Sequence, residues 1–556
     1  MKYSGAEIVI KLLEKQNVEY IIGIPGGFNL PIYDALYFSH IKHILARHEQ
    51  GAGFIAQGIS RTSNKVGVCM ATSGPGVTNL LTAIADAKLD SIPLVAITGQ
   101  VPLSSIGTDA FQEVDTYGLT IPITKHNFLV RKIEDLFTII PEAFRLASEG
   151  RPGPVLVDLP KDIQTGIIDI DNFDLCLYKY KEEYHTDLNL NLKEIAKMIN
   201  SSKRPIIYAG GGIINSNSSK LLYDFSKKNT IPVALSLMGI SAFPSDDDLY
   251  LGMVGMHGAP YTNYLFNEAD LIIALGVRFD DRATGSIASF CPNANVIHVD
   301  IDPSEINKIK HSNISLVSNV YNFLQAIIKE TERNDRLEWI NRIKQYKEKY
   351  PLPHYNNKLH PANLIPFIAN NIPSDTIITT NVGEHQMWVA QRYPFKTPKT
   401  FITSGGLGTM GFGLPTAIGA ALENPNKTIL CFSGDGSILM NIQELATLKD
   451  YNLNIKVIIL NNHHLGLVRQ QQELFYNKHY IASKFISNPQ FNTIAEGFGI
   501  KGYNLLNENS LDSLIDILNS PNPSIINVPI KDTEMILPMV SPGGSNIDMI
   551  GGVINE

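Results

Sequence analysis

The chain has 556 residues, with 46 lysines and arginines against 54 aspartates and glutamates, so its formal net charge is −8. This charge disfavours a nucleic-acid-binding protein, and 44% apolar and 18% charged residues are typical of a globular chain. The length predicts about three to five domains of roughly 100–200 residues each. The four cysteines are widely separated, and no uncharged apolar run reaches the roughly 18 residues of a membrane span. We therefore expect a cytoplasmic enzyme that binds neither nucleic acid nor a membrane.

Residues 1–168 predict an α/β domain. Ser4 and Glu7 have the spacing of a capping box, so a helix is expected to begin there. Short apolar strands then alternate with helices, which is typical of a parallel sheet covered on both faces. We expect strands at 20–24, 44–46, 66–71, 93–98 and 154–160, and helices from about residue 49 and over 77–88.

The same pattern returns twice. Residues 169–192 are polar without clear periodicity and are interpreted as a linker. A middle domain, 193–335, has predicted strands at 205–209, 232–237, 271–275 and 296–300. The charged, tyrosine-rich segment 336–360 is interpreted as a second linker. A third domain with a C-terminal arm, 361–556, has predicted strands at 377–380, 429–433, 455–460 and 524–528. The fold class expected is therefore α/β, with three doubly wound parallel-sheet domains.

The third domain contains a candidate metal site. Asp435, between two glycines, follows a predicted buried strand, and Asn462 follows the next one. Glycines let backbone amides and a helix N-terminus approach a phosphate, while a carboxylate and an amide oxygen suit Mg²⁺ that also binds phosphate and water. A lone Gly-Asp-Gly is also typical of a hairpin turn. The paired Asn462 and the flanking strands favour the metal site.

Two further segments allow more than one interpretation. Gly406, Gly408 and Gly411 match the dinucleotide fingerprint by letter, but the preceding strand is short and no clear acidic residue ends a following strand, which disfavours a nicotinamide dehydrogenase. We interpret 404–411 as a tight loop against a flat ligand, with Met410 as apolar support; a plain glycine-rich turn is the alternative. Glu49 is either an acid that favours a helix N-terminus or, together with the loop 72–76, part of a ligand site at strand ends.

The motifs of the chain resemble those of a known family, the catalytic large subunits of acetohydroxyacid synthase, also called acetolactate synthase, among the thiamine diphosphate enzymes. The resemblance covers essentially the whole chain. It rests on both third-domain motifs and on RHEQ (47–50), ATSGPG (71–76), GTDAFQE (107–113), TKHNF (124–128), GRPGP (150–154), GMHG (255–258) and VRFDDR (277–282). The last two segments narrow the resemblance from thiamine diphosphate enzymes in general to this family.

The resemblance implies an activity, three cofactors and partners. The enzyme would decarboxylate pyruvate on thiamine diphosphate and transfer the hydroxyethyl group to a second 2-oxoacid, pyruvate or 2-oxobutyrate, in the first common step of valine, leucine and isoleucine biosynthesis. Mg²⁺ and FAD are the other implied cofactors. A homodimer or dimer of dimers with active sites between subunits is implied, with a small regulatory subunit as an option. Alternatives are another thiamine diphosphate 2-oxoacid decarboxylase, a pyruvate oxidase, or a cofactor-binding scaffold without turnover.

The resemblance also implies roles for individual residues. Glu49 matches the glutamate that hydrogen-bonds the aminopyrimidine ring; Gln112 and the backbone of Gly27 match the substrate side, and Lys161 and Arg282 the mouth of the site. The other matches to thiamine diphosphate positions are Pro25, Thr72, Asn79, His385, Gly408, Met410, Gly434, Gly436, Ser437 and Gly466. The matches to FAD positions are Arg151, Gly210, Gly211, Gly212, Met256, His257, Gly276, Arg278 and Asp300. The matches to magnesium ligands are Asp435, Asn462 and the backbone carbonyl of His464.

Five positions depart from the pattern of the family. Gln471 replaces a tryptophan that shapes the acceptor pocket, Leu467 a methionine, and Phe28 a small alanine. One methylene in a pocket is worth roughly 1–3 kcal/mol, so losing the wall that senses it predicts weak discrimination between pyruvate and 2-oxobutyrate. Asn319 replaces an aspartate and Glu384 a glutamine, and both bear on FAD affinity and local packing.

Overall fold

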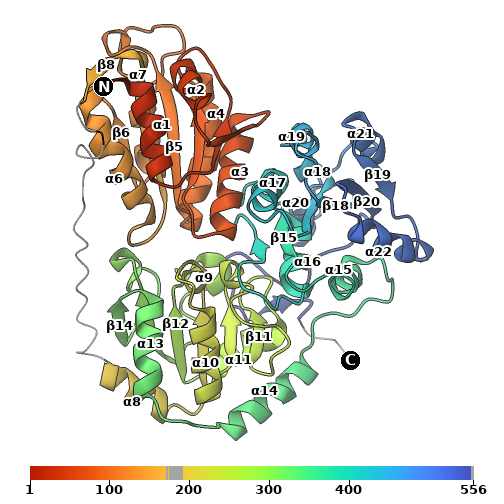
Figure 1. Ribbon diagram of the computed structural model, residues 1–556. Coiled ribbons are helices and arrows are strands. Elements are labelled where there is room, and N and C mark those ends of the chain that lie inside the picture. Colours follow the sequence, from red (N-terminus) through yellow and green to blue (C-terminus); the bar gives the residue numbers. More distant parts are fainter. Residues whose placement is uncertain (171–172, 174–191, 553–556) are drawn as a thin grey trace.

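The computed structural model describes residues 1–170, 173 and 192–552. Figure 1 shows three bodies, each built around a sheet with helices on its two faces. Each body contains one six-stranded sheet in which every pair of neighbouring strands is parallel. This confirms the predicted fold class. Nearly all of the predicted linker 169–192, with Cys176, lies outside the described residues.

The first domain begins with the predicted capping box. Ser4 N donates to Glu7 Oε2 at 2.7 Å, Glu7 N donates to Ser4 Oγ at 3.2 Å, and α1 (Gly5–Lys15) follows. The sheet order is β3-β2-β4-β5-β7-β6. Its strands are β2 (Tyr20–Gly23), β3 (Lys42–Leu45), β4 (Gly67–Ala71), β5 (Leu94–Gln100), β6 (His126–Leu129) and β7 (Pro154–Pro160). The other helices are α2 (Leu30–Leu36), α3 (Glu49–Thr62), α4 (Pro75–Asp90), α5 (Thr116–Thr120), α6 (Leu136–Ser148) and α7 (Lys161–Thr165), and β1 (Lys2–Ser4) pairs with β8 (Ile167–Asp169).

The middle domain has the sheet order β11-β10-β9-β12-β13-β14. Its strands are β9 (Pro205–Ala209), β10 (Val233–Leu235), β11 (Tyr250–Met253), β12 (Leu271–Leu275), β13 (Asn295–Asp300) and β14 (Ile314–Val317). Its helices are α8 (Leu192–Ser201), α9 (Gly211–Asn215), α10 (Ser219–Asn229), α11 (Pro260–Glu268), α12 (Asp281–Thr284) and α13 (Val320–Glu330). The middle of this sheet is a set of apolar strands buried on both faces, as expected for a parallel sheet.

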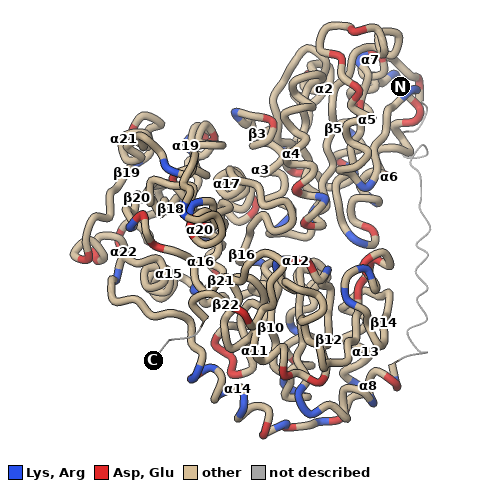
Figure 2. Tube along the Cα trace, turned by 180° about the vertical axis from the view of Figure 1, so that it is seen from behind, with Lys and Arg blue, Asp and Glu red and all other residues tan. Residues whose placement is uncertain are grey.

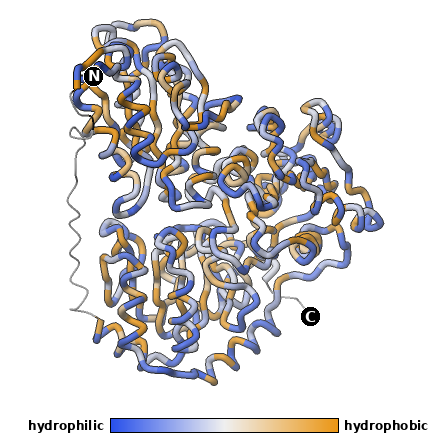
Figure 3. The backbone as a smooth tube through the Cα atoms, in the orientation of Figure 1, coloured by the Kyte–Doolittle hydropathy of each residue, from blue (hydrophilic) through white to orange (hydrophobic). Residues whose placement is uncertain are grey.

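The segment 336–360 contains a helix, α14 (Leu337–Lys349), where the sequence predicts a linker. Buried Trp339 donates from Nε1 to the carbonyl of Pro205 at 3.0 Å, so α14 is anchored to the middle domain. Charged residues recur along α14, and its hydropathy alternates along the helix (Figures 2 and 3). A helix with one charged, exposed face contains many charged residues overall, and its composition therefore resembles that of a linker.

The third domain has the sheet order β16-β15-β17-β18-β20-β19. Its strands are β15 (Ile377–Thr380), β16 (Phe401–Ile402), β17 (Ile429–Gly434), β18 (Ile455–Asn461), β19 (Lys501–Asn504) and β20 (Ser524–Pro529). Its helices are α15 (Pro361–Asn370), α16 (Glu384–Arg392), α17 (Gly413–Glu423), α18 (Asp435–Ile438), α19 (Glu444–Asp450), α20 (Gly466–Phe475), α21 (Phe491–Gly497) and α22 (Leu511–Asn519). In the C-terminal arm, β21 (Met539–Val540) pairs with β22 (Met549–Ile550).

The first and third domains are joined by direct packing of α3 on α17. A Cβ added at Gly58 would lie 2.2 Å from the carbonyl oxygen of Thr416, and one at Gly419 would lie 1.9 Å from that of Ile55. These two glycines therefore allow the helix backbones to approach closely. Phe54 and Phe412 meet edge to face across the same contact, at a centroid distance of 5.2 Å. One apolar core consequently runs through both domains.

None of the helices within residues 1–170 and 192–552 is long and apolar enough to cross a membrane.

Candidate active site

The third domain has a topological switch point between β15 and β17, where neighbouring strands continue to opposite faces and ligands bind in doubly wound folds. His385 follows β15, and Asp435 follows β17 as the first residue of α18. The two lie close, because a Cβ added at Gly434 would be 3.0 Å from Nδ1 of His385. Buried Nε2 of His385 and Oδ1 of Asp435 both lack a hydrogen-bond partner. Two orphaned polar atoms at a switch point fit a missing polar ligand.

Asn462 lies beside this pair, directly after β18. Its Nδ2 donates to Oε2 of Glu384 at 3.0 Å, and its Oδ1 accepts from the amide of His464 at 3.1 Å. Among the described residues, no cluster of three His, Cys, Asp or Glu side chains could hold a metal. The predicted set instead offers one carboxylate, one amide oxygen and one backbone carbonyl. Such a sparse oxygen set fits Mg²⁺, which completes its shell with water and phosphate oxygens.

Burial controls the ionisation of the side chains around His385, Asp435 and Asn462, which we call the Asp435 pole. It lowers the pKa of His385 to about 3, so the imidazole is neutral. It also raises the pKa of Asp435, against the hydrogen bond that Oδ2 accepts from Asn488 at 2.7 Å. The pKa of Glu384 is raised to about 8 by burial and, less strongly, by Asp435, while Arg469 opposes the shift. A dication would favour the charged forms of both carboxyl groups.

The remaining third-domain positions surround the same strand ends. Gly436 and Ser437 form the first turn of α18, and Gly466 opens α20. Ser437 Oγ donates to the carbonyl of Val382 at 2.8 Å, which ties α18 to the loop after β15. Gly408 has φ +70° in the loop before α17, and Met410 follows it, half-buried. The strand before this loop, β16, has only two residues, so no dinucleotide-binding turn is built there.

The first domain has an equivalent switch point between β2 and β4. Pro25 and Gly27 follow β2, and Thr72 follows β4. Glu49 is the first residue of α3, and its Oε2 accepts from Nδ2 of Asn79 on α4 at 3.0 Å. The structure thus brings Glu49 together with Asn79 at the carboxyl edge of the sheet, and we refer to these two residues with Pro25, Gly27 and Thr72 as the Glu49 cluster.

Gln112 and Lys161 flank this edge. Gln112 has φ +60°, and its Cα lies 2.9 Å from a Cβ added at Gly74, so it contacts the loop after β4. Glu113 holds the loop in place by accepting the amides of Thr108 at 3.2 Å and Ala110 at 3.1 Å.

Lys161 opens α7, and its ammonium lies 5.6 Å from the centroid of the Phe28 ring. Phe28 therefore stands beside a candidate catalytic residue.

The middle domain borders a cavity of about 890 Å³. Its strand order changes direction between β9 and β12, and the cavity lies at the carboxyl ends of these strands. Gly276 has φ +58°, and its added Cβ would lie 2.6 Å from Cα of Gly212, so only glycine permits this turn. Gly210 does not line the cavity but packs against the carbonyl of Gly276. The predicted residues that line the cavity are Arg151, Gly211, Gly212, Met256, His257, Gly276, Arg278 and Asp300.

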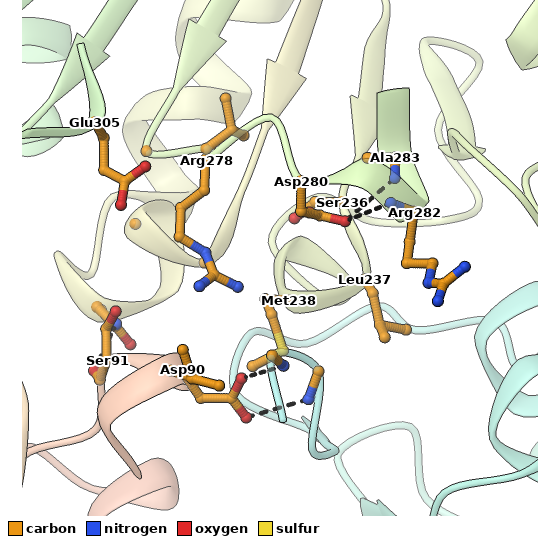
Figure 4. A pocket seen from close by; sticks show the side chains of 18 of the residues that line it. Asp90, Ser91, Ser236, Leu237, Met238, Arg278, Asp280, Arg282, Ala283 and Glu305 are labelled. Atoms are coloured by element: carbon orange, nitrogen blue, oxygen red, sulfur yellow. Dashed lines mark hydrogen bonds between the residues drawn. The ribbon is translucent and has the colours of Figure 1, made fainter. Parts of the chain in front are cut away.

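Figure 4 shows Glu305 and Arg278 on one side of the cavity and Asp280 and Arg282 on the other. Arg151 Nη1 lies 2.7 Å from Glu305 Oε1 and 3.2 Å from Asp302 Oδ2, and burial raises the pKa of Asp300 to about 6.

Elsewhere in the cavity wall, His257 Nδ1 lies 3.1 Å from the carbonyl oxygen of Pro538, and burial lowers its pKa to about 4. Neutral His257 is therefore committed to the backbone of the C-terminal arm.

The same cavity reaches the predicted mouth of the site. Arg282, Leu467, Gln471, Gly408 and Asn319 all line it. Among the described residues, the Glu49 side of the first domain and the Asp435 pole do not line it. One chain therefore carries a continuous cavity and two separate clusters at its outer switch points.

Sequence reasoning missed several cavity residues, among them Asp90, Met238 and Glu305. For Asp90 a signal was present: two acids, Asp86 and Asp90, stand one turn apart in a helix that is otherwise small and apolar at its buried positions. Buried acids in such a helix need a partner, and that partner is distant in sequence. Met238 and Glu305 carried no comparable local signal.

Comparisons with known proteins agree with these three bodies. Residues 3–119 match the family model "Thiamine pyrophosphate enzyme, N-terminal TPP binding domain", 192–327 match the central domain, and 381–528 match the C-terminal TPP binding domain. The chain is 50% identical over 554 residues to "Acetolactate synthase isozyme 1 large subunit" of Escherichia coli (strain K12), covering 99% of this chain and 98% of that protein. It is 46% identical to "Acetolactate synthase large subunit" of Lactococcus lactis (99% and 96% covered) and 44% identical to "Probable acetolactate synthase large subunit" of Methanocaldococcus jannaschii (97% and 94% covered).

Proposed function

This chain belongs to the acetolactate synthase large subunits of the thiamine diphosphate enzymes, and we propose that its outer switch points bind that cofactor in two halves and its cavity binds FAD. The resemblance expected from the sequence motifs is confirmed, and the chain is a thiamine diphosphate-dependent acetolactate synthase. The observation that carries the proposed placement is the pair of orphaned atoms, on His385 and Asp435, at the third-domain switch point.

Thiamine diphosphate supplies the electron sink for decarboxylating a 2-oxoacid. The protein positions it. Asp435, Asn462 and the carbonyl of His464 would hold Mg²⁺, while His385, Ser437 and the nearby glycines would bind the diphosphate. In the first domain, Glu49 would hold a proton at a ring nitrogen of the pyrimidine, and its bond from Asn79 keeps the carboxylate oriented.

Substrate recognition is assigned to residues around these clusters. The side chain of Gln112 and the amide of Gly27 would stabilise developing negative charge on the 2-oxoacid. Arg282 is exposed at the cavity mouth and permanently charged, so its planar guanidinium suits a bidentate contact with the acceptor carboxylate. Lys161 would provide a second cation at the mouth.

FAD fits the cavity for two reasons. The cavity lies at the switch point of a sheet with the strand order typical of dinucleotide-binding domains, and glycines remove side chains from its wall. Its size of about 890 Å³ is that of a large ligand site. Asn319, which replaces the family aspartate, lines the cavity but already accepts the amide of Tyr321 at 2.9 Å as the N-cap of α13.

The assembly proposed is a homodimer or a dimer of dimers with cofactor sites between subunits. The Glu49 cluster and the Asp435 pole are separate clusters in one chain, which suits completion of each half by a second copy. Apolar side chains on the surface of the first domain, including Phe111 at 81% exposure, favour burial in such an interface. Relatives named large subunits support a small regulatory partner.

Product analysis tests the proposal. Purified enzyme is given pyruvate, with and without 2-oxobutyrate, in the presence of thiamine diphosphate and Mg²⁺, with and without FAD. We expect acetolactate from pyruvate, a mixture of both acetohydroxyacids in competition, and loss of activity when FAD is withheld. Mainly acetaldehyde would indicate a simple decarboxylase, and bleaching of the flavin by pyruvate would indicate an oxidase. Mostly acetohydroxybutyrate would contradict weak acceptor discrimination.

A further inference from the structure

Three buried charged residues lie at the junction of the first and third domains, and we refer to Arg61, Asp86 and Asp90 as the Arg61 cluster. Arg61 lies in the last turn of α3, and the two acids lie one turn apart on α4. Arg61 Nη2 lies 3.2 Å from Asp86 Oδ1 and 2.8 Å from Asp90 Oδ2. The side chains are 5%, 0% and 0% exposed, so this ion pair is shielded from water.

The cluster holds a loop of the third domain, residues 404–409. Asp90 accepts the amides of Gly405 at 3.2 Å and Gly406 at 2.7 Å, as Figure 4 shows. Asp86 Oδ2 accepts the hydroxyl of Thr409 at 3.0 Å and that of Ser404.

Arg61 adds a fifth hydrogen bond by donating from Nη1 to the carbonyl of Thr403, the residue before the loop, at 3.1 Å. Both ends of the loop are therefore bonded to the first domain.

Charge balance explains why this contact is specific. Two carboxylates face one guanidinium, so the cluster retains a net negative charge in a place where a charge without partners is costly. The loop supplies the missing compensation with two amide and two hydroxyl donors. Burial, and then Asp90, raise the pKa of Asp86 to about 6 against the pull of Arg61, which is consistent with this strain on the acids. If the loop moved away, both acids would lose these donors.

The loop faces the cavity. Gly405, Gly406 and Gly408 line it, together with Asp90 itself. A Cβ added at Gly405 would collide with the sulfur of Met238 from the middle domain, so the loop lies where all three domains meet. Met410 follows immediately along the chain.

We propose that Arg61, Asp86 and Asp90 are positioning residues that set the place of loop 404–409 and of Met410 after it, and thereby the affinity for both organic cofactors. The inference rests on the proposed roles of Gly408 and Met410 beside thiamine diphosphate and of the cavity as the FAD site. The cluster acts through the loop and touches no reacting atom. We therefore expect it to affect cofactor binding more than turnover of the fully loaded enzyme.

The test is Asp90→Asn in the full-length enzyme, with two readouts. Hydrogen exchange of the 405 and 406 amides is followed by mass spectrometry, and the dissociation constants of FAD and thiamine diphosphate are measured by titration. Weakening a charged acceptor predicts exchange and dissociation constants raised about tenfold or more. The kcat at saturating cofactors should fall by a smaller factor than the cofactor affinities do.

Asp450→Asn is the matched control. Asp450 also bridges the first and third domains, pairing with Arg47 at 2.6 Å, but it is half-exposed and contacts no part of the loop. We expect this variant to change neither exchange at 405 and 406 nor cofactor affinity.

Ser404→Ala guards against an Asp90 variant that fails to fold. It removes the hydroxyl that donates to Asp86 and accepts the amide of Thr409 at 2.9 Å. The same shifts are expected, about threefold or more. Unchanged cofactor affinities in both variants, with only a lower melting temperature, would overturn the inference and leave the cluster as a domain contact. A wild-type chain that binds neither cofactor would overturn the proposed function as well.

Discussion

The first and third domains have the same strand order, yet their switch points carry different chemistry. In both sheets the second strand lies at the edge, followed by the first, third, fourth, sixth and fifth. At the third-domain switch point stand a buried carboxylate, Asp435, and a buried imidazole, His385. At the first-domain switch point stand Pro25, Gly27 and Thr72, none of which carries a charge. One topology therefore offers a switch point with a buried carboxylate and imidazole, suited to a metal and phosphates, and a second whose loops are uncharged beside the single acid Glu49, suited to a ring.

The middle domain differs from both, because its strand order is that of a dinucleotide-binding sheet and its cavity is continuous within one chain. The comparison shows that topology selects where a ligand binds, while the residues after each strand select what binds. Four variants test this division.

Glu49→Gln should have the largest effect, because Glu49 is the one acid assigned to proton handling in the first-domain half. We expect kcat to fall by about 10²–10⁴-fold while the dissociation constant of thiamine diphosphate changes little. Steady-state kinetics and cofactor titration measure the two quantities. Glu19→Gln, an exposed first-domain acid paired with Lys65, is the control. An equal loss of kcat in both variants would show that Glu49 has no special role.

Asp435→Asn should have the opposite effect to Glu49→Gln, because it should weaken cofactor binding. Removing the only carboxylate of the metal set weakens Mg²⁺, so thiamine diphosphate should bind about tenfold or more weakly at a fixed Mg²⁺ concentration, and excess Mg²⁺ should restore part of the loss. Isothermal titration with and without Mg²⁺ measures this. If binding were unchanged, the carboxylate would not be a metal ligand.

Gln471→Trp probes the segment that follows the fourth strand of the third domain. The equivalent segment of the first domain, after its own fourth strand, contains Gln112. A ring at the cavity wall should restore sensing of the extra methylene and raise the preference for 2-oxobutyrate over pyruvate by about tenfold. Competition of the two acceptors, with both products quantified, gives this ratio. Phe28→Ala in the same assay shows whether the first-domain ring contributes. A ratio unmoved by either change would place acceptor selection elsewhere.

Asp158→Asn gives one position of the first domain the residue type that the third domain has at the equivalent position. In the sheet register Asp158 pairs with Thr98 on the fourth strand, and the equivalent position of the third domain is Asn527, which pairs with Ile459. Burial raises the pKa of Asp158 to about 7, while hydrogen bonds from Thr98 and Gln100 oppose the shift. The native state therefore holds a proton that the unfolded chain, with a pKa near the ordinary aspartate value, has already lost.

Because the native state binds more protons between about pH 4 and 7, this group stabilises the fold at low pH, and the contribution is lost as pH rises through that window. The free energy of unfolding of Asp158→Asn minus that of the wild type should therefore increase with pH by about 2–4 kcal/mol. Denaturant unfolding at pH 4, 5.5 and 7.5 measures it. A difference independent of pH would mean that Asp158 is ionised throughout.

Central strands were predictable from the sequence because each is buried on both faces and appears as a continuous apolar run. The strands β9, β12 and β15 begin and end where the sequence predicts. Of the edge strands only β3 was predicted, with shifted bounds, whereas a strand such as β19 mixes exposed and half-buried residues and shows no such run. For the same reason α14 was interpreted as a linker: only its Trp339 face is buried.

The sequence alone established the α/β alternation, the family, and the candidate residues at strand ends, because these depend on local runs and on motifs. Tertiary structure decided the strand orders, and with them which of those strand ends become neighbours at a switch point. It also decided the partners of Asp86 and Asp90, which are separated by more than 300 residues from the loop they hold. Such long-range pairing depends on how α3 and α4 pack against the third domain, and no local pattern encodes that contact.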